Sequence, residues 1–327
     1  MKVFITGGSG FIGGAVIEKL RDRHEFLAMS RSAASDAALK RIGAQAVRGD
    51  LSRIEPDLLR GCEAVVHCAA HIGPGGDRDY YWKINVEGTE QLVNAAKAAG
   101  VKRFVHLGTE AGCFYGQHMR DIDETCPLAP DSPYHYPATK AEAERRVLRA
   151  NDPAHGFETI SIRPRLVWGP GDRTLLPSMV KAARAHALVW IDGGRHQTST
   201  THVANVVRGV ELALEGKGRG GEAYFVTDDE VRSFREIITA LLTTQGLTPG
   251  RLSIPSPLVR GGVYLLQKSW EGLGIKAHLP INRFAVALMA RDCTIRIDKA
   301  RRELGFEPVI SFSEGLKQLP KLQNDPA

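Results

Sequence analysis

The feature that most constrains this chain is its opening stretch, residues 2–20. Residues 2–6 form a short apolar, β-branched run, which predicts a buried strand. Gly7, Gly10 and Gly13 follow at three-residue spacing, and apolar residues then recur at helical intervals. Glycine permits a positive φ and a close approach of backbone to ligand, and the N-terminus of the next helix offers free N–H groups. The stretch therefore predicts a strand, a glycine turn and a helix that together suit a pyrophosphate.

The rest of the chain alternates between predicted strands and helices. This alternation is typical of a parallel sheet covered by helices on both faces, so we predict a Rossmann-type doubly wound α/β fold. We expect an NAD(P)-binding domain over residues 1–170, rejoined by residues 200–228, and a smaller α/β substrate lid over 171–327. The predicted strands are 2–6, 25–30, 44–48, 63–70, 102–109, 158–164 and 222–228, and the main predicted helices are 36–42, 84–100, 136–150, 203–215 and 233–246.

Composition excludes several classes of protein. The chain has 327 residues and a net charge of +6 with scattered Lys and Arg, which does not suit nucleic acid. Its five cysteines show no C-x-x-C spacing, which argues for a reducing compartment and against a disulfide framework or a metal site. We expect no signal peptide, because residue 3 already belongs to a core strand. Nor does any apolar run reach the about 18–20 residues of a membrane span. The cytoplasm is the predicted location.

Three polar side chains are predicted to meet at one edge of the sheet. Tyr136 and Lys140 stand four residues apart, so they share one side of a helix, and Thr109 ends the fifth predicted strand. Ligands of such sheets bind at the C-terminal ends of the strands. We predict that Tyr136 is an acid/base whose pKa the Lys140 cation lowers, and that Thr109 orients a substrate oxygen for hydride transfer.

The order of motifs resembles that of the extended short-chain dehydrogenases/reductases, the NAD-dependent epimerase/dehydratase superfamily. The glycine spacing G-x-x-G-x-x-G is followed by "HCAA", "NVEGT", the Tyr136/Lys140 pair and "IRPRLVWGPGD". "GEAYFVTDDE" and "TIRIDKARRELGFEP" are similar to the 3β-hydroxysteroid dehydrogenase and sterol-4α-carboxylate dehydrogenase branch. The resemblance implies that Asp50 contacts adenine and that Lys140 also binds the nicotinamide ribose. The implied cofactor-binding set is Gly7, Gly10, Phe11, Ile12, Gly13, Asp50, Leu51, Ala69, Ala70 and Lys140.

The chain departs from this branch at the end of the fifth predicted strand. The branch usually has Ser-Ser or Ser-Thr there, whereas this chain reads Gly108-Thr109-Glu110. In relatives that dehydrate nucleotide sugars, an acidic residue after this hydroxyl takes part in elimination. Because Glu110 has no placed acid/base partner, we expect its carboxylate to lie at the pocket edge and contact solvent or a backbone amide.

The second predicted strand ends in Ser30 and Arg31, with no acidic residue. An acidic residue there would bind the ribose hydroxyls of NAD, whereas an arginine suits the 2′-phosphate of NADP, so NADP is preferred over NAD. Part of the apolar segment 258–289 is predicted to line a pocket over the nicotinamide for an apolar substrate, either steroid-like or a β-oxygenated acid. Its apolar residues are Val259, Val263, Leu265, Leu266, Leu273, Ile275, Ile281, Phe284, Val286 and Leu288. An ordinary lid core, a membrane-surface contact or a dimer contact remains open as the alternative. The predicted function is the interconversion of a secondary alcohol and a ketone.

Two alternatives remain open from the sequence: a nucleotide-sugar epimerase or dehydratase, and a non-catalytic NADP-sensing protein. The first typically carries Asn where this chain has Leu166, and Arg-Asp where it has Thr198-Ser199. The second commonly loses the Tyr/Lys pair that this chain keeps. A homodimer is a family expectation, and the other predicted partner is a small-molecule substrate.

Overall fold

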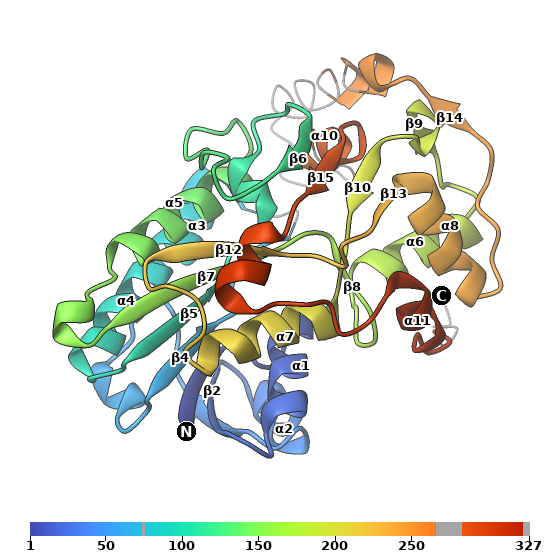
Figure 1. The fold of residues 1–327 in the computed structure, drawn as a ribbon. Helices are drawn as coiled ribbons and strands as arrows, with labels where there is room; N and C mark the ends of the chain where they lie inside the picture. The colour runs from blue at the N-terminus through green and yellow to red at the C-terminus, as the bar shows by residue number, and fades with distance from the viewer. Residues whose placement is uncertain (74–75, 260, 264, 266–282, 323–327) are drawn as a thin grey trace.

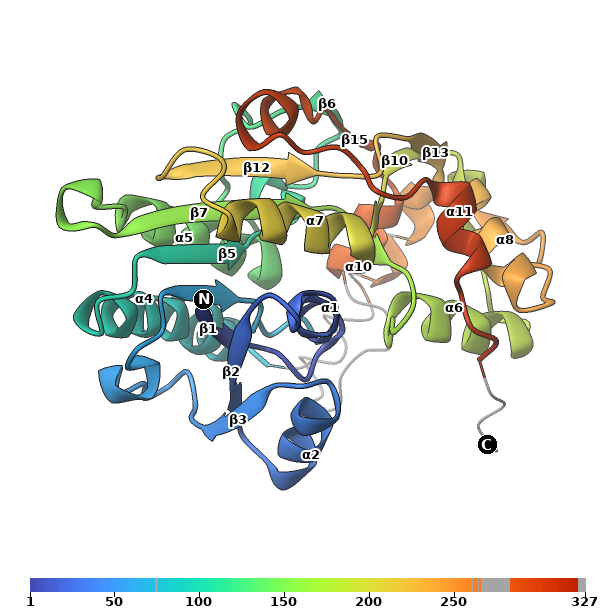
Figure 2. The same ribbon diagram turned by 60° about the horizontal axis from the view of Figure 1, so that its bottom comes forward.

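The centre of the molecule is a parallel sheet of seven strands. The computed structural model describes the whole chain except residues 74–75, 260, 264, 266–282 and 323–327. The strand order is β12-β7-β5-β4-β1-β2-β3, which Figure 2 shows stacked from β12 at the top to β3 at the bottom. The strands are β1 (Lys2–Thr6), β2 (Glu25–Ser30), β3 (Gln45–Arg48), β4 (Ala64–His67), β5 (Arg103–Leu107), β7 (Glu158–Pro164) and β12 (Glu222–Val226).

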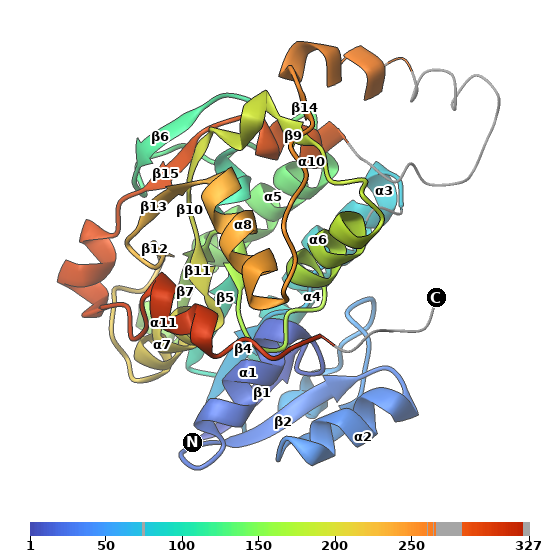
Figure 3. The ribbon, with the colours of Figure 1, turned by 90° about the vertical axis from the view of Figure 1, so that its right-hand side faces the viewer.

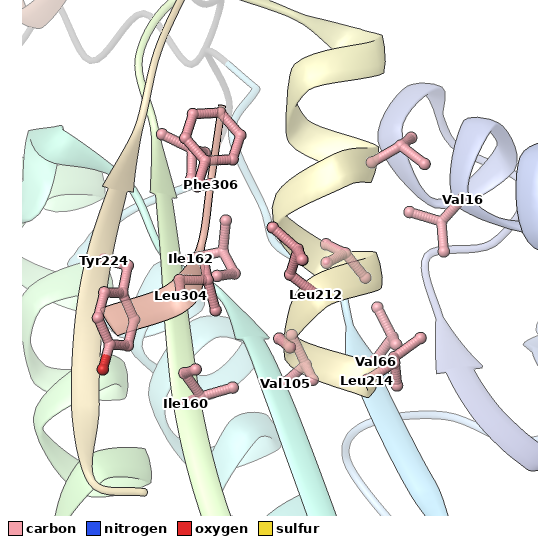
Figure 4. Packing of buried hydrophobic residues seen from close by; sticks show 14 of the residues in the cluster. Val16, Val66, Val105, Ile160, Ile162, Leu212, Leu214, Tyr224, Leu304 and Phe306 are labelled. Atoms are coloured by element: carbon pink, nitrogen blue, oxygen red, sulfur yellow. The ribbon is translucent and has the colours of Figure 1, made fainter. Parts of the chain in front are cut away.

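Helices cover both faces of this sheet because successive strand residues point to opposite sides. Val3 and Ile5 pack in one buried cluster, whereas Phe4 between them packs in another. Figure 4 shows the first cluster, in which Val16 and Leu212 meet the sheet. One layer holds α1 (Phe11–Leu20), α2 (Ala33–Arg41) and α7 (Val203–Leu214), and the other holds α3 (Arg78–Trp82), α4 (Gly88–Ala98) and α5 (His135–Arg149) (Figure 1). The predicted doubly wound α/β fold is confirmed.

A second, four-stranded sheet has the order β13-β10-β15-β6 and lies toward the C-terminal part of the molecule (Figures 1 and 3). A separate apolar cluster around Trp168, Trp190 and Leu241 joins the helices beside it. The strands of this sheet are β6 (Met119–Ile122), β10 (Gln197–Ser199), β13 (Val231–Ser233) and β15 (Cys293–Ile295), and the helices of this part are α6 (Leu175–Arg184), α8 (Phe234–Thr244), α10 (Arg283–Met289) and α11 (Phe312–Lys317).

Several predicted elements differ from those observed. The predicted helix over 84–100 begins instead with a π-helical turn, Lys83–Glu87, and continues as α4. In that turn the Asn85 side chain accepts a hydrogen bond from the His71 N–H and donates one to the His71 carbonyl oxygen. These two bonds attach the helix to the chain after β4. β4 ends at His67 rather than at residue 70, and β6 was not predicted, because its pairing with β15 joins residues far apart in sequence.

Two further features complete the fold. Ser233 and Glu236 form both hydrogen bonds of a capping box at the start of α8. β12 pairs in parallel with β7 at one edge of the seven-stranded sheet. Among the residues described, no helix combines the length and apolar character needed to cross a membrane.

Candidate active site

The turn after β1 is built from glycines because the backbone there is crowded. Gly7 has a φ of +70°, and a Cβ on it would lie 2.8 Å from the backbone nitrogen of Ala69. A Cβ on Gly13 would lie 2.4 Å from the carbonyl oxygen of Gly7. Gly10 is the N-cap of α1 and provides no side-chain cap, so the first-turn N–H groups face outward without a side-chain partner. The turn therefore forms a cradle that suits the phosphates of a dinucleotide.

A hollow of about 440 Å³ opens beside this turn. The structure brings six of the predicted cofactor residues to its wall, and the start of α1 carries Gly10, Phe11, Ile12 and Gly13 next to it. Ser30 differs, because it is buried and its hydroxyl donates to the carbonyl oxygen of Ser32 at 3.1 Å. The six predicted residues on the wall are Gly7, Arg31, Asp50, Leu51, Ala69 and Ala70.

Asp50, Arg31 and Lys83 are charged side chains on the wall of this hollow. Hydrogen bonds from Ser52, including one from the Ser52 N–H to Asp50 Oδ1 at 2.8 Å, lower the pKa of Asp50, and Arg31 acts in the same direction. Asp50 is therefore an ionised acceptor at neutral pH, and Arg31 is exposed beside it. Cations, a carboxylate and free helix N–H groups around one hollow fit a nicotinamide adenine dinucleotide.

The Tyr136/Lys140 pair lies in the first turns of α5. Lys140 is buried, and its Nζ donates to the carbonyl oxygen of Leu107 at 2.7 Å and lies 3.3 Å from Nε2 of His106. Burial lowers the pKa of Lys140 to about 8. Burial raises the pKa of Tyr136, and the Glu110 carboxylate raises it further. The expectation that Lys140 lowers the tyrosine pKa is therefore wrong for this structure, because desolvation outweighs the effect of a cation directed toward β5.

Thr109 and Glu110 form a hydrogen-bonded unit at the end of β5. The Thr109 hydroxyl donates to Oε2 of Glu110 at 2.8 Å and accepts from the Ala111 N–H at 3.2 Å. The other carboxylate oxygen of Glu110 accepts from Nη1 of Arg165, and both charged side chains are buried. The expectation that Glu110 meets solvent or a backbone amide is wrong, because β7 leads directly to Arg165, which places a buried cation opposite the carboxylate.

Close packing explains why position 108 is a glycine, and the sequence did not reveal this. A Cβ at this position would lie 2.4 Å from Oε2 of Glu144 and 2.5 Å from Oγ of Ser161. Glu144 is buried, accepts a hydrogen bond from Ser161 at 2.8 Å and pairs with Arg163. The glycine that replaces the usual serine thus makes room for a second buried ion pair under the site.

A second hollow, of about 410 Å³, is lined in part by Tyr134. The ring of Phe284 contacts both Tyr134 and Tyr136, with centroid distances of 5.7 Å and 5.8 Å. Of the apolar residues expected to line a substrate pocket, Leu266, Leu273, Ile275 and Ile281 lie outside the described residues. The lining consists of Tyr134, Pro257, Gly261, Val263, Arg283, Val286 and Ala287.

Some residues at the site escaped the sequence analysis. Asn85 binds the His71 backbone and donates to Thr139 in α5, so it couples three segments beside the hollow. Its motif, "NVEGT", was noted, but a single sequence does not show which member matters. Elsewhere, His118, His196 and Asp292 come within 4.8 Å of one another. Arg120 and the Gln197 N–H already occupy the Asp292 carboxylate, so we describe this group as an ion-pair network.

Comparison with known proteins agrees with this geometry. Residues 3–226 match the model of the NAD dependent epimerase/dehydratase family. The 4-hydroxy-2-methyl-3-oxo-4-farnesyl-3,4-dihydroquinoline-1-oxide ketoreductase of Stigmatella aurantiaca is 40% identical over 98% of this chain and 96% of its own. The 2-alkyl-3-oxoalkanoate reductase of Stenotrophomonas maltophilia is 33% identical over 98% of both chains. The decarboxylating sterol-4-alpha-carboxylate 3-dehydrogenase of Dictyostelium discoideum is 29% identical over 97% of this chain and 99% of its own.

The chain belongs to the NAD-dependent epimerase/dehydratase family. The predicted resemblance to extended short-chain dehydrogenases/reductases, with relatives in the sterol dehydrogenase branch, is confirmed, as is the prediction of an enzyme. Among solved structures, UDP-glucuronic acid 4-epimerase from Bacillus cereus, in complex with NAD, has a TM-score of 0.75 over 98% of this chain and 97% of its own. At 21% identity this likeness supports the shared fold.

Proposed function

We propose that this enzyme is an NADP(H)-dependent reductase that interconverts a ketone and a secondary alcohol on an apolar substrate, either steroid-like or a β-oxygenated acid. The observation that carries the proposal is the largely apolar hollow lined by Tyr134, whose ring contacts Phe284, which in turn contacts the ring of Tyr136. Apolar walls with a few convergent polar groups are typical of sites for apolar small molecules. The ketoreductase and 3-oxoalkanoate reductase relatives support the same class of substrate.

The residues divide the chemistry among them as follows. Reduced nicotinamide, when bound, supplies a hydride to the carbonyl carbon. Tyr136 donates its phenolic proton to the carbonyl oxygen, and in the reverse direction takes the proton from the alcohol. Lys140 holds the ribose of the cofactor, and its hydrogen bond to the Leu107 carbonyl oxygen anchors it at the end of β5. Thr109 holds the reacting oxygen in place.

NADP is preferred over NAD because Arg31 lies exposed on the wall of the cofactor hollow, beside the start of α2. An arginine can bind a 2′-phosphate with two parallel hydrogen bonds. Asp36, three residues after the start of α2 at Ala33, forms an ion pair with Arg48, so its carboxylate is engaged by that cation.

A spectrophotometric screen tests the function. Steroid ketones, long-chain 3-oxo esters and nucleotide sugars would each be offered with NADPH and with NADH, and oxidation followed at the nicotinamide absorbance. We expect NADPH oxidation with an apolar ketone and none in the Tyr136→Phe variant. Turnover of a nucleotide sugar alone would establish the epimerase or dehydratase alternative. Cofactor binding without turnover of any compound would favour the non-catalytic sensor.

A further inference from the structure

Two cysteine side chains meet next to the segment that carries Thr109. Cys113 is the last residue of the short 3₁₀ helix Glu110–Cys113, whose N-cap is Thr109, and Cys126 lies in the loop that follows β6. Sγ of Cys113 lies 3.5 Å from the carbonyl oxygen of Cys126, and the two thiols are within hydrogen-bonding reach of each other. The fold thus brings together two free thiols that stand 13 positions apart in the sequence.

The two cysteines differ in exposure and in acidity. Cys113 is buried, whereas Cys126 is half-buried. Hydrogen bonding between the two thiols lowers the pKa of Cys126 against the effect of burial, and the Arg163 cation acts in the lowering direction. Hydrogen bonding and burial raise the pKa of Cys113. Because the thiolate is the reactive form of cysteine, Cys126 is the nucleophile of the pair and Cys113 its protonated neighbour.

The other three cysteines, all in the described part of the chain, lack this combination. Cys62 and Cys293 are buried, and burial raises the pKa of each. Cys68 is half-buried as a residue, but burial of its thiol raises its pKa to about 12. Of the five cysteines, Cys126 alone combines partial exposure, a lowered pKa and a thiol neighbour. This combination is typical of cysteines that are oxidised reversibly.

We propose that Cys126 and Cys113 form a site of oxidation by hydroperoxides, in which Cys126 is oxidised first and Cys113 then closes a disulfide with it. The Cys126 thiolate attacks one oxygen of the peroxide, the O–O bond breaks, and a sulfenic acid forms with release of hydroxide, which takes up a proton. The Cys113 sulfur then attacks the sulfur of the sulfenic acid, and water leaves with the Cys113 proton. The two thiols together lose two electrons, and the peroxide gains them.

The backbone around the pair suits this bond. Neither residue belongs to a strand or an α-helix, since Cys113 ends a single 3₁₀ turn and Cys126 lies in a loop. The two segments are already joined, because the Ala129 N–H donates to the carbonyl oxygen of Gly112 at 2.7 Å. The disulfide therefore forms between segments that the native fold holds side by side, and little further ordering is needed.

The disulfide acts on the active site through the 3₁₀ turn. The Thr109 hydroxyl accepts from the Ala111 N–H at 3.2 Å, and the Thr109 carbonyl oxygen accepts from the Gly112 N–H at 3.2 Å. Drawing Cys113 toward Cys126 pulls on the same turn that holds Thr109 in place. We therefore expect oxidation to lower turnover and reduction to restore it, an effect that rests on the role of Thr109 in the proposed function.

Peptide mass spectrometry after mild oxidation tests the site itself. The reduced protein is treated with an equimolar amount of hydrogen peroxide, and the remaining thiols are alkylated. We expect a Cys113–Cys126 disulfide that dithiothreitol reverses. Cys113→Ala should stop at a sulfenic acid on Cys126, which dimedone labels, and Cys126→Ser should form neither product. Cys62→Ala is the matched control, and it should form the disulfide as wild type does.

Alkylation of the untreated protein provides a measurement that needs no variant. Iodoacetamide at neutral pH should modify Cys126 at least about tenfold faster than Cys62, because it reacts with the thiolate. Oxidation or alkylation of another cysteine before Cys126 would overturn the proposal. So would a sulfenic acid on Cys126 that never gives the disulfide in wild type.

These measurements need no substrate, so their outcome is independent of the proposed function. With a confirmed ketone and reduced cofactor, peroxide should lower the kcat of wild type several-fold and leave the kcat of Cys126→Ser unchanged. If the disulfide forms and kcat stays the same, the link from the pair to the active site is wrong, while the proposed function stands. If no ketone is turned over by the reduced protein, the proposed function fails and the oxidation site is judged on the mass spectra.

Discussion

Lys140 donates a hydrogen bond from Nζ to the backbone carbonyl oxygen of Leu107 at 2.7 Å, so that the buried cation is anchored to the end of β5. The neighbouring His106 offers an imidazole at 3.3 Å, and burial keeps the pKa of that histidine well below its usual value. Burial lowers the pKa of Lys140 to about 8, although the Glu144 carboxylate acts in the opposite direction.

Lys140 should make the stability of the protein depend on pH in the alkaline range. Its pKa is about 8 when folded and 10.5 in the reference state, so between these values the unfolded chain binds more protons. Stability therefore gains a contribution that rises with pH from about 8 to 10.5, and below about 8 the cost of burying the cation is fully present. Urea unfolding of wild type and Lys140→Met across this range should show the rise in wild type alone. Lys102→Met, at an exposed lysine just before the start of β5, should behave like wild type.

Tyr136→Phe removes one oxygen and little volume, so folding and cofactor affinity should stay close to wild type. Turnover should fall by about 10²–10⁴-fold, the contribution typical of a positioned proton-transfer group. Steady-state rates with a confirmed ketone, and cofactor titration by fluorescence, measure the two quantities. A Tyr136→Phe variant that reduces the ketone at the wild-type rate would contradict the assignment of Tyr136 as the acid/base. Tyr115→Phe, at an exposed tyrosine, is the matched control.

Arg31→Ala should weaken NADPH binding by about tenfold or more and leave NADH binding nearly unchanged, because a charge-assisted contact to the 2′-phosphate would be lost. Calorimetric titration of both reduced cofactors provides the comparison. Arg53→Ala removes an arginine that is also exposed and near β3, and should affect neither cofactor. Equal NADPH affinity in wild type and Arg31→Ala would remove the argument for NADP.

Gly108→Ala should destabilise the protein by about 1–3 kcal/mol, the cost typical of overpacking a rigid site. The added Cβ would meet Glu144 and Ser161 within 2.5 Å, and neither can move without disturbing the buried pair with Arg163. Chemical denaturation measures the loss. Ser161→Ala in the same protein should recover part of it, and Gly262→Ala, where a Cβ meets nothing within 4 Å, should cost little. A fully stable Gly108→Ala protein would contradict the packing explanation.

The sequence by itself determined the features that depend on local periodicity and turn chemistry. The bounds of β1, β2 and β7 agree with the sequence prediction, because each is a short apolar run ended by turn residues. The spacing of Tyr136 and Lys140 on one helix and the capping box of α8 follow from residues at most four positions apart. The glycine turn follows in part from the sequence, since Gly13 is crowded by Gly7 six positions away, whereas Gly7 is crowded by Ala69, which the sheet brings to it.

Only the tertiary structure decided the interactions between residues far apart in the chain. Glu110 pairs with Arg165 across 55 positions, and the packing of Glu144 against Gly108 spans 36. The sequence does not show which residues will surround Glu110 or Glu144 and exclude water from them. The sequence analysis therefore predicted an exposed Glu110 and a lowered pKa for Tyr136. Burial reversed both expectations, because the free energy of a charged group depends on everything that excludes water around it, and those groups come from several strands at once.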